Sequence, residues 1–150
     1  MTAELLCLAL AVYYEARSEP LLGQAAVAEV VLNRVESPNF PETICDVVKQ
    51  GGTERYRCQF TYWCDGKTEN PRHRLAWRRA KVVAKLTQAG VIRTSADRAT
   101  HYHADYVKPY WRTRLEPVTV IGLHHFYVDN RAMRPTTLAA SMAATLASLQ

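Results

Sequence analysis

The stretch AVYYEARSEPLLGQAAVAEVVLNRV, residues 11–35, decides the architecture of this chain. Its first part continues an apolar helical pattern, and Pro20 disfavours helical backbone at the residue before it, so we expect a helix over about residues 2–18. The second part, Leu21–Val35, is apolar nearly all round, which is typical of a central, buried helix. Among these apolar residues stands one carboxylate, Glu15, whose place needs a chemical explanation.

Glu15 is expected to share a helical face with core residues. At 3.6 residues per turn it lies almost over Leu8 and one turn from Val12. Burial of an unpaired carboxylate is costly and raises its pKa, because desolvation disfavours the charged form. A carboxylic acid that stays protonated near neutral pH can protonate a leaving group, so Glu15 is a candidate general acid. The alternative is a structural ion pair with Arg17 or Arg34.

The composition indicates one folded domain over residues 1–150. Hydrophobic residues make up 48% and charged residues 22%, a globular composition. The formal net charge of +5 favours anionic partners such as nucleic acid, anionic lipid or a wall polymer, although solubility alone also explains it. No stretch approaches the ~20 apolar residues of a membrane helix, so no stable membrane insertion is expected. The apolar run Leu5–Val12 lacks the flanks of a signal peptide.

The rest of the chain predicts more helices and a little β-structure. Three further helices are expected, each starting at a proline: Pro41–Gln50, Pro71–Ala89 and Pro135–Leu149. Alternating side chains predict strands or extended segments at Tyr56–Tyr62, Thr100–His103 and Val118–Val128. Gly122 marks a bulge or bend within the last of these. The expected class is α+β, mostly helical with one small sheet.

Ordered motifs resemble those of the SleB/CwlJ family of spore-cortex-lytic and cell-wall hydrolases. The family pattern EARGEP, GQ, AVA, VLNRV and P-x-FP-x-TI-x-x-VV is matched by residues 15–48. Further matches lie at Gln59-Phe60, in ATHYHADYVKPYW at residues 99–111 and in IGLHHFY at Ile121–Tyr127. The resemblance covers about residues 5–128. It implies a lysozyme-like or resuscitation-factor-like domain with a small antiparallel sheet, and the expected last helix, about 135–149, falls outside it.

The resemblance implies cleavage of peptidoglycan glycan strands between N-acetylmuramic acid and N-acetylglucosamine, most simply as a lytic transglycosylase that forms 1,6-anhydromuramic ends. The family's catalytic glutamate falls on Glu15. Ser18 replaces the glycine of the motif, which affects the local backbone rather than the acid. Hydrolysing glycosidases use two carboxylates, whereas a lytic transglycosylase needs one, so we expect Glu19 to orient backbone or substrate. No cofactor and no metal are implied.

Other polar and aromatic residues are candidates for a sugar-binding groove. They are Gln24, Gln59, Phe60, Tyr62, Tyr102 and His103. Aromatic faces stack on sugar rings and amides bind hydroxyl and acetamide groups, and Gln59 and Phe60 match the family motif. Tyr102 would steady developing positive charge. Gln24, on the buried helix, is equally consistent with a satisfied core polar group.

Two other functions stay open at this stage. The residues His101, His103, His124, His125, Cys58 and Cys64 offer potential zinc ligands, as in a zinc-dependent amidase that cuts the muramoyl–peptide link. No HExxH motif and no paired CxxC motif accompany them. The basic segment 72–85, with Trp77, would instead suit nucleic acid. No recognised nucleic-acid-binding motif appears, so we expect no nucleic-acid partner.

The four cysteines allow free thiols or three disulfide connectivities. Cys7 and Cys45 lie on the first and third expected helices, and Cys58 and Cys64 flank a short aromatic segment. Our hypothesis pairs Cys7 with Cys45 and Cys58 with Cys64. The chain is expected to act as a monomer on the bacterial cell wall, in the periplasm or outside the cell. It would be either a phage endolysin released by a holin or a trimmed part of an exported enzyme.

Overall fold

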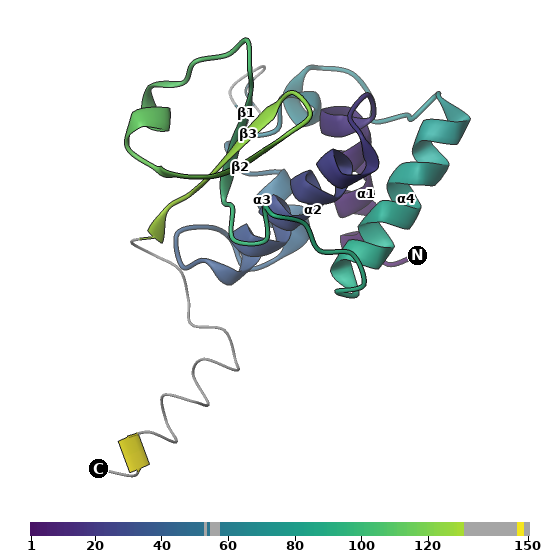
Figure 1. Ribbon diagram of the computed structural model, residues 1–150. Coiled ribbons are helices and arrows are strands. Elements are labelled where there is room, and N and C mark those ends of the chain that lie inside the picture. Colours follow the sequence, from purple (N-terminus) through teal and green to yellow (C-terminus); the bar gives the residue numbers. More distant parts are fainter. Residues whose placement is uncertain (53, 55–57, 131–146, 149–150) are drawn as a thin grey trace.

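The computed structural model describes residues 1–52, 54, 58–130 and 147–148 (Figure 1). The first two helices, α1 (Ala3–Ala16) and α2 (Leu21–Glu36), agree with the prediction to within two residues at each end. The Thr2 side chain caps α1 by accepting a hydrogen bond from the Leu5 amide. The chain leaves α1 and enters α2 through Pro20, which lies in extended backbone.

The α2 helix is central because it is buried on two sides. Ala25, Ala28 and Val31 pack into a core shared with α1 and with two later helices, α3 (Ile44–Val48) and α4 (Arg74–Gln88). Ala26 and Val30 pack on the other side against Phe126 of the sheet. This arrangement confirms the prediction of a central, buried helix, and Figure 1 shows α2 between the sheet and the pair α1 and α4.

The next two helices begin later than their prolines predicted. Helix α3 covers only Ile44–Val48, because Thr43 adopts extended backbone and its side chain accepts a hydrogen bond from the Asp46 amide. Helix α4 covers Arg74–Gln88, and His73 caps it through Nδ1, which accepts from the Ala76 amide. Capping side chains thus set these starts.

The alternating segment at 56–62 was predicted as a strand or extended loop, and its described part contains no strand. Thr61–Cys64 is instead a short 3-10 helix, η1. The reason is the disulfide between Cys58 and Cys64, whose Cα atoms lie 6.1 Å apart. Six extended residues would span about 20 Å, so the disulfide excludes an extended conformation.

The sheet has three antiparallel strands, β1 (His101–Ala104), β2 (Glu116–Ile121) and β3 (His124–Val128), in the order β1-β3-β2. A second short 3-10 helix, η2 (Tyr110–Thr113), lies between β1 and β2. The predicted segment 118–128 is a hairpin whose turn contains Gly122 at φ +57°. Glycine adopts this conformation without the strain that a side chain adds. The helix predicted at 135–149 lies outside the described residues.

Both hypothesised disulfides are confirmed. Cys7–Cys45 joins α1 to α3, and Cys58–Cys64 closes the loop that holds η1. Within the described part of the chain, no helix has the length and apolar character needed to cross a bilayer.

Candidate active site

Glu15 lies in the last turn of α1, on the side that faces the sheet. Leu8 and Val12, which share its face, are fully buried, as the helical spacing predicts. The Tyr102 hydroxyl, from β1, donates a hydrogen bond of 3.1 Å to Oε2 of Glu15. Arg17 is not its partner, because this guanidinium donates to the Tyr13 hydroxyl at 2.8 Å.

Burial dominates the electrostatics of Glu15. Desolvation raises the pKa of this carboxyl group, while the Tyr102 hydrogen bond and the positive charge of Arg34 act in the opposite direction. Because burial is the largest of the three effects, the pKa of Glu15 lies above the ordinary value for glutamate. The group is therefore protonated over a wider pH range than a surface glutamate.

Arg34 is the cation of this site. It is buried on α2, and its Nε donates to the Thr100 carbonyl oxygen at 2.7 Å. Its guanidinium lies 4.8 Å from the centre of the Phe40 ring, and one terminal nitrogen, Nη1, has no hydrogen-bond partner. Burial lowers the pKa of Arg34 to about 10, so the side chain remains charged at neutral pH.

A pocket of about 160 Å³ opens beside the Glu15 carboxyl group. Its lining comes from α1, α2, β1 and the start of η1 with the two residues before it: Glu15, Arg34, Gln59, Phe60, Thr61 and Tyr102. The structure thus brings four of the predicted site residues together. The sequence reasoning missed Thr61 as a pocket residue, and it named Arg34 only as a possible structural ion-pair partner of Glu15. A buried arginine on a mostly apolar helix is the signal for Arg34; Thr61 only follows the matched Gln59-Phe60 pair.

Tyr62 borders a second hollow next to the first. Its ring stacks on that of Tyr14 with 4.6 Å between the centroids. The two tyrosines line a pocket of about 320 Å³ together with charged and polar residues from the following loop: Asp65, Lys67, Thr68, Glu69, Asn70 and Arg72. Burial raises the pKa of Tyr62, and the nearby negative charge of Glu15 adds to this effect. Tyr62 is thus within electrostatic reach of the acid.

Two further candidates lie away from the Glu15 pocket. His103 follows Tyr102 on β1 and so points to the opposite face of the sheet. There its Nε2 lies 3.0 Å from the Tyr127 hydroxyl, and its ring stacks on His125. Gln24 is fully buried, and its amide nitrogen donates to the Glu19 carbonyl oxygen at 3.0 Å.

Glu19 joins the α1–α2 connection to the β2–β3 turn. Its two carboxylate oxygens lie 3.2 and 3.3 Å from the Leu123 amide, which donates to them. Oε1 also lies 3.4 Å from Nδ1 of His124, whose pKa is lowered by burial. A methyl group on Gly122 would collide with Oε2 of Glu19. This carboxylate is therefore held by the hairpin rather than turned toward the Glu15 pocket.

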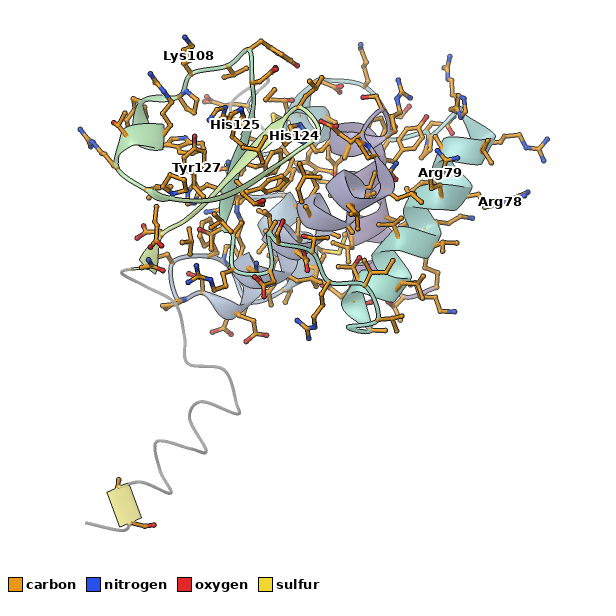
Figure 2. The ribbon with its side chains drawn as sticks, viewed as in Figure 1. Arg78, Arg79, Lys108, His124, His125 and Tyr127 are labelled. Carbon is orange, nitrogen blue, oxygen red and sulfur yellow. A yellow bond between two sulfur atoms is a disulfide. The ribbon has the colours of Figure 1, made fainter. Side chains whose placement is uncertain are left out.

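The residues considered for zinc are not gathered into one site. Cys58 and Cys64 are joined to each other, so they offer no thiolate. His124 and His125 are neighbours on β3 and face opposite sides of the sheet, and both are labelled in Figure 2. Within the described residues, no group of three or more His, Cys, Asp or Glu side chains is arranged to hold a metal.

The fold and the pocket together define a lysozyme-like domain with one carboxylic acid at the junction of a helix and a small sheet. Residues 18–127 match the family model described as Cell Wall Hydrolase, and the chain belongs to that family.

Two solved structures have the same fold over most of the chain. The catalytic domain of the germination-specific lytic transglycosylase SleB from Bacillus anthracis superposes with a TM-score of 0.67 and 32% identity, covering 85% of this chain and 95% of that domain. The catalytic domain of the Bacillus cereus SleB protein gives a TM-score of 0.63 and 31% identity, covering 83% and 88% respectively.

Curated relatives match over a shorter stretch. The spore cortex-lytic enzyme of Bacillus cereus is 60% identical over 38 residues, which are 25% of this chain and 15% of that enzyme. The spore cortex-lytic enzyme of Bacillus subtilis (strain 168) is 56% identical over 41 residues, which are 27% of this chain and 13% of that enzyme. The matches thus span a small part of the length of these enzymes.

Proposed function

We propose that this chain cleaves the bond between N-acetylmuramic acid and N-acetylglucosamine in peptidoglycan, as a lytic transglycosylase with Glu15 as the acid and then the base. The observation that carries the proposal is the Glu15 carboxyl group, which lines an open pocket while burial holds its pKa above the ordinary value. The described lining of this pocket contains no second carboxylate. The likeness to the SleB lytic transglycosylase domain supports the same reaction.

The reaction needs one proton donor that becomes one proton acceptor. Protonated Glu15 gives its proton to the glycosidic oxygen as the bond to C1 of the muramic residue breaks. The C6 hydroxyl of the same residue then attacks C1, and the Glu15 carboxylate accepts the hydroxyl proton. The products are a 1,6-anhydromuramic end and a new free hydroxyl on the departing sugar, and Glu15 ends protonated as it began.

The neighbours of Glu15 suit this cycle. After the first proton transfer, Glu15 is an anion, and the Tyr102 hydroxyl and the Arg34 charge both stabilise that anion. Burial raises the pKa of Tyr102 well above its ordinary value, so its hydroxyl stays neutral and keeps its proton to donate. Glu19 is held by the Leu123 amide, which leaves it as a positioning residue and agrees with a mechanism that uses one carboxylate.

The walls of the pocket supply the groups that would bind the glycan strand. Gln59 is exposed and offers its amide, Phe60 lines the pocket as part of its apolar wall, and Thr61 adds a hydroxyl. The adjoining hollow at Tyr62 would extend this groove. His103 and Gln24 would act from behind it, His103 by holding the outer face of the sheet and Gln24 by fixing the Glu19 carbonyl group.

Digestion of purified sacculi tests the reaction in one measurement. Mass spectrometry of the soluble muropeptides should show 1,6-anhydromuramic ends, and the rate in EDTA should equal the untreated rate. Reducing muramic ends would instead indicate hydrolysis by water. Free stem peptide, with activity lost in EDTA and restored by zinc, would replace the proposal with an amidase. The site of action follows from the substrate: the cell wall, in the periplasm or outside the cell.

A further inference from the structure

The outer face of α4 carries apolar side chains that the core does not use. Leu75 is 58% exposed and Val82 is 51% exposed. They are seven residues apart, which is two helical turns, so they lie on one side of the helix. The core is formed by a different side of α4, whose buried residues are Ala80, Val83, Ala84 and Thr87.

Cations frame this apolar stripe. Arg78 and Lys85, also seven residues apart, are exposed along one flank, and Arg79 is exposed along the other. No aspartate or glutamate occurs between Arg74 and Gln88. These arginines and lysines take no part in the salt bridge found among the described residues, which joins Glu19 and His124.

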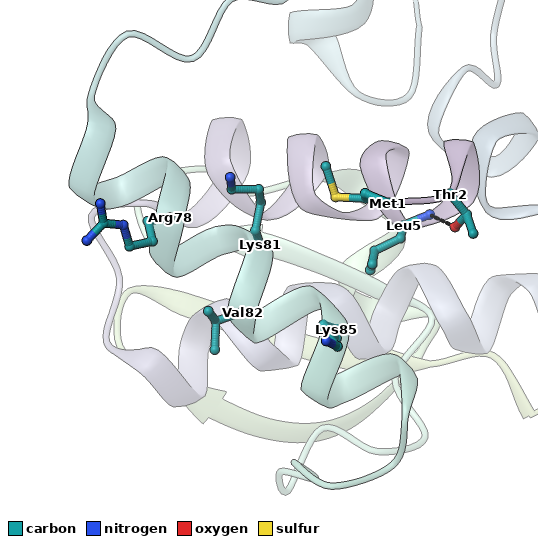
Figure 3. Close-up of a pocket in the computed structure, with 7 residues that line it drawn as sticks. All are labelled: Met1, Thr2, Leu5, Arg78, Lys81, Val82 and Lys85. Atoms are coloured by element: carbon teal, nitrogen blue, oxygen red, sulfur yellow. Dashed lines mark hydrogen bonds between the residues drawn. The ribbon is translucent and has the colours of Figure 1, made fainter.

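Two shallow grooves flank the stripe and share Val82 and Arg78. The larger, of about 760 Å³, lies between α4 and the start of α1, where Leu5, Lys81 and Lys85 also line it (Figure 3). The smaller, of about 330 Å³, lies between α4 and the start of α2, and its lining includes Leu21, Leu75, Arg79, Leu86 and Ile92. Leu21 is itself 56% exposed. The apolar surface therefore extends across three helices rather than ending at one side chain.

We propose that this surface, which we define as the α4 face (Leu21, Leu75, Arg78, Arg79, Val82 and Lys85), binds the surface of an anionic phospholipid bilayer. A helix that lies in a bilayer interface presents apolar side chains to the acyl boundary and lysines or arginines to the lipid phosphates. Long cationic side chains reach up to the phosphates while their stems cover apolar surface. Leu75 and Val82, with Arg78, Arg79 and Lys85 around them, provide both parts of this arrangement.

Other occupants fit the α4 face less well. A nucleic acid or an anionic wall polymer would use the cations but not the exposed leucine and valine side chains. A second copy of the chain, packed by a two-fold axis, would bring the same arginines against one another. The chain's own residues 131–150 contain two arginines and no aspartate or glutamate, so they do not complement the charge.

The α4 face lies away from the Glu15 pocket. Helix α4 packs against α1 and α2, and Figure 1 shows it on the far side of the helices from the sheet. The pocket is built from the end of α1, from α2, from β1 and from residues 59–61. A domain that rests on a bilayer through α4 thus keeps its pocket free for glycan.

Sedimentation with vesicles tests the α4 face. The protein, at 0.1 M salt, should sediment with vesicles of equal parts phosphatidylglycerol and phosphatidylcholine and stay in solution with phosphatidylcholine alone. Arg78→Glu should weaken the partitioning at least about tenfold. The matched control is Lys108→Glu, which makes the same change in net charge on an exposed residue far from α4 (Figure 2) and should stay within about twofold of the unaltered protein.

A second variant separates lipid binding from simple attraction to anions. Leu75→Ser with Val82→Ser keeps every charge and should also weaken partitioning at least about fivefold, because the apolar contact is lost. If this variant binds vesicles as well as the unaltered protein does, the proposal is overturned and the α4 face is a surface for polyanions in general. Retention of the unaltered protein on DNA, with no binding to vesicles, would lead to the same conclusion. All these variants should digest sacculi at the unaltered rate. The vesicle experiment therefore tests bilayer binding by the α4 face independently of the proposed reaction.

Discussion

The hydroxyl of Tyr102 on β1 donates a hydrogen bond to the carboxylate of Glu15 at the end of α1, across 87 residues of sequence. This contact joins the sheet to the helix that carries the acid. It also sets the acid's properties, since it favours the anionic form against the larger effect of burial.

Tyr102→Phe should move the basic limb of the pH–rate profile to higher pH. The lost hydrogen bond favoured the carboxylate, so its removal raises the pKa of Glu15 further, and the acid remains protonated to a higher pH. The maximal rate should fall about tenfold, because the Glu15 anion that forms in the proposed reaction loses a hydrogen bond. Profiles of kcat/KM for both proteins provide the check. A limb that stays in place would mean that Tyr102 does not act on Glu15.

Glu15→Gln should lower the rate of glycan cleavage at least ~10²-fold, since glutamine keeps the shape but has no proton to give. The folded protein should not suffer. Because burial raises the pKa of Glu15 in the folded state, its ionisation destabilises the fold once the pH exceeds the ordinary glutamate value, and this cost is absent below that value. Near pH 7 the variant should therefore melt at the same temperature or higher, and near pH 4 the two proteins should agree. A variant that melts much lower at pH 7 would make Glu15 a structural ion-pair partner.

Helical periodicity predicted the inward orientation of Glu15 correctly, because that orientation depends only on nearby residues of the same helix. The helical register that buries Leu8 and Val12 also turns Glu15 inward. The two buried sides of α2 explain why its sequence is apolar nearly all round. The contact partners of Glu15 could not be obtained this way. Tyr102 and Arg34 reach the site only through the packing of β1 and α2 around it, and apolar spacing along one helix carries no information about that packing.

Two predictions near the pocket, one of secondary structure and one of a site residue, differ from the structure. Alternating side chains near Phe60 predicted a strand or an extended loop, but the disulfide between Cys58 and Cys64, six residues apart, excludes an extended conformation between them. His103 was grouped with Tyr102 because both fall in a matched motif, yet neighbours on a strand point to opposite faces. Only Tyr102 lines the pocket, and the strand rule alone would have separated the two.

Gly122→Ala should destabilise the protein, and Glu19 should account for part of the loss. The new methyl group meets the Glu19 carboxylate and sits at a positive φ that favours glycine. We expect about 2 kcal/mol from chemical denaturation, of which about 1 is backbone strain. Glu19→Ala alone should also cost about 1 kcal/mol, because the Leu123 amide loses its acceptor.

A double-mutant cycle measures the interaction between Glu19 and the methyl group added at position 122. In the Glu19→Ala background, Gly122→Ala should cost about 1 kcal/mol less than it does alone, because the carboxylate that it meets is gone. If the free-energy losses of the two substitutions simply add, the Glu19 side chain moves aside without cost and does not position the turn.

The two disulfides should separate stability from activity. Cys7→Ser with Cys45→Ser opens a link over 38 residues, and Cys58→Ser with Cys64→Ser opens one over 6 residues. Loop entropy puts their losses at about 4 and about 2 kcal/mol of unfolding free energy. The shorter loop, however, contains Gln59, Phe60 and Thr61, which line the pocket, whereas the longer link joins α1 to α3 away from it.

Of the two variants, the Cys58/Cys64 variant should therefore show the larger loss in digestion rate. The Cys7/Cys45 variant should show the larger loss in the free energy of unfolding. The measurement is the rate of sacculus digestion at a temperature where urea titration shows both variants to be folded. Under those conditions the Cys7/Cys45 variant should retain most of its rate. The Cys58/Cys64 variant should digest at least about tenfold more slowly if the pocket wall positions substrate as proposed, since a small displacement of such groups is costly to catalysis. Equal rates for the two folded variants would show that the short disulfide does not hold the pocket wall in place.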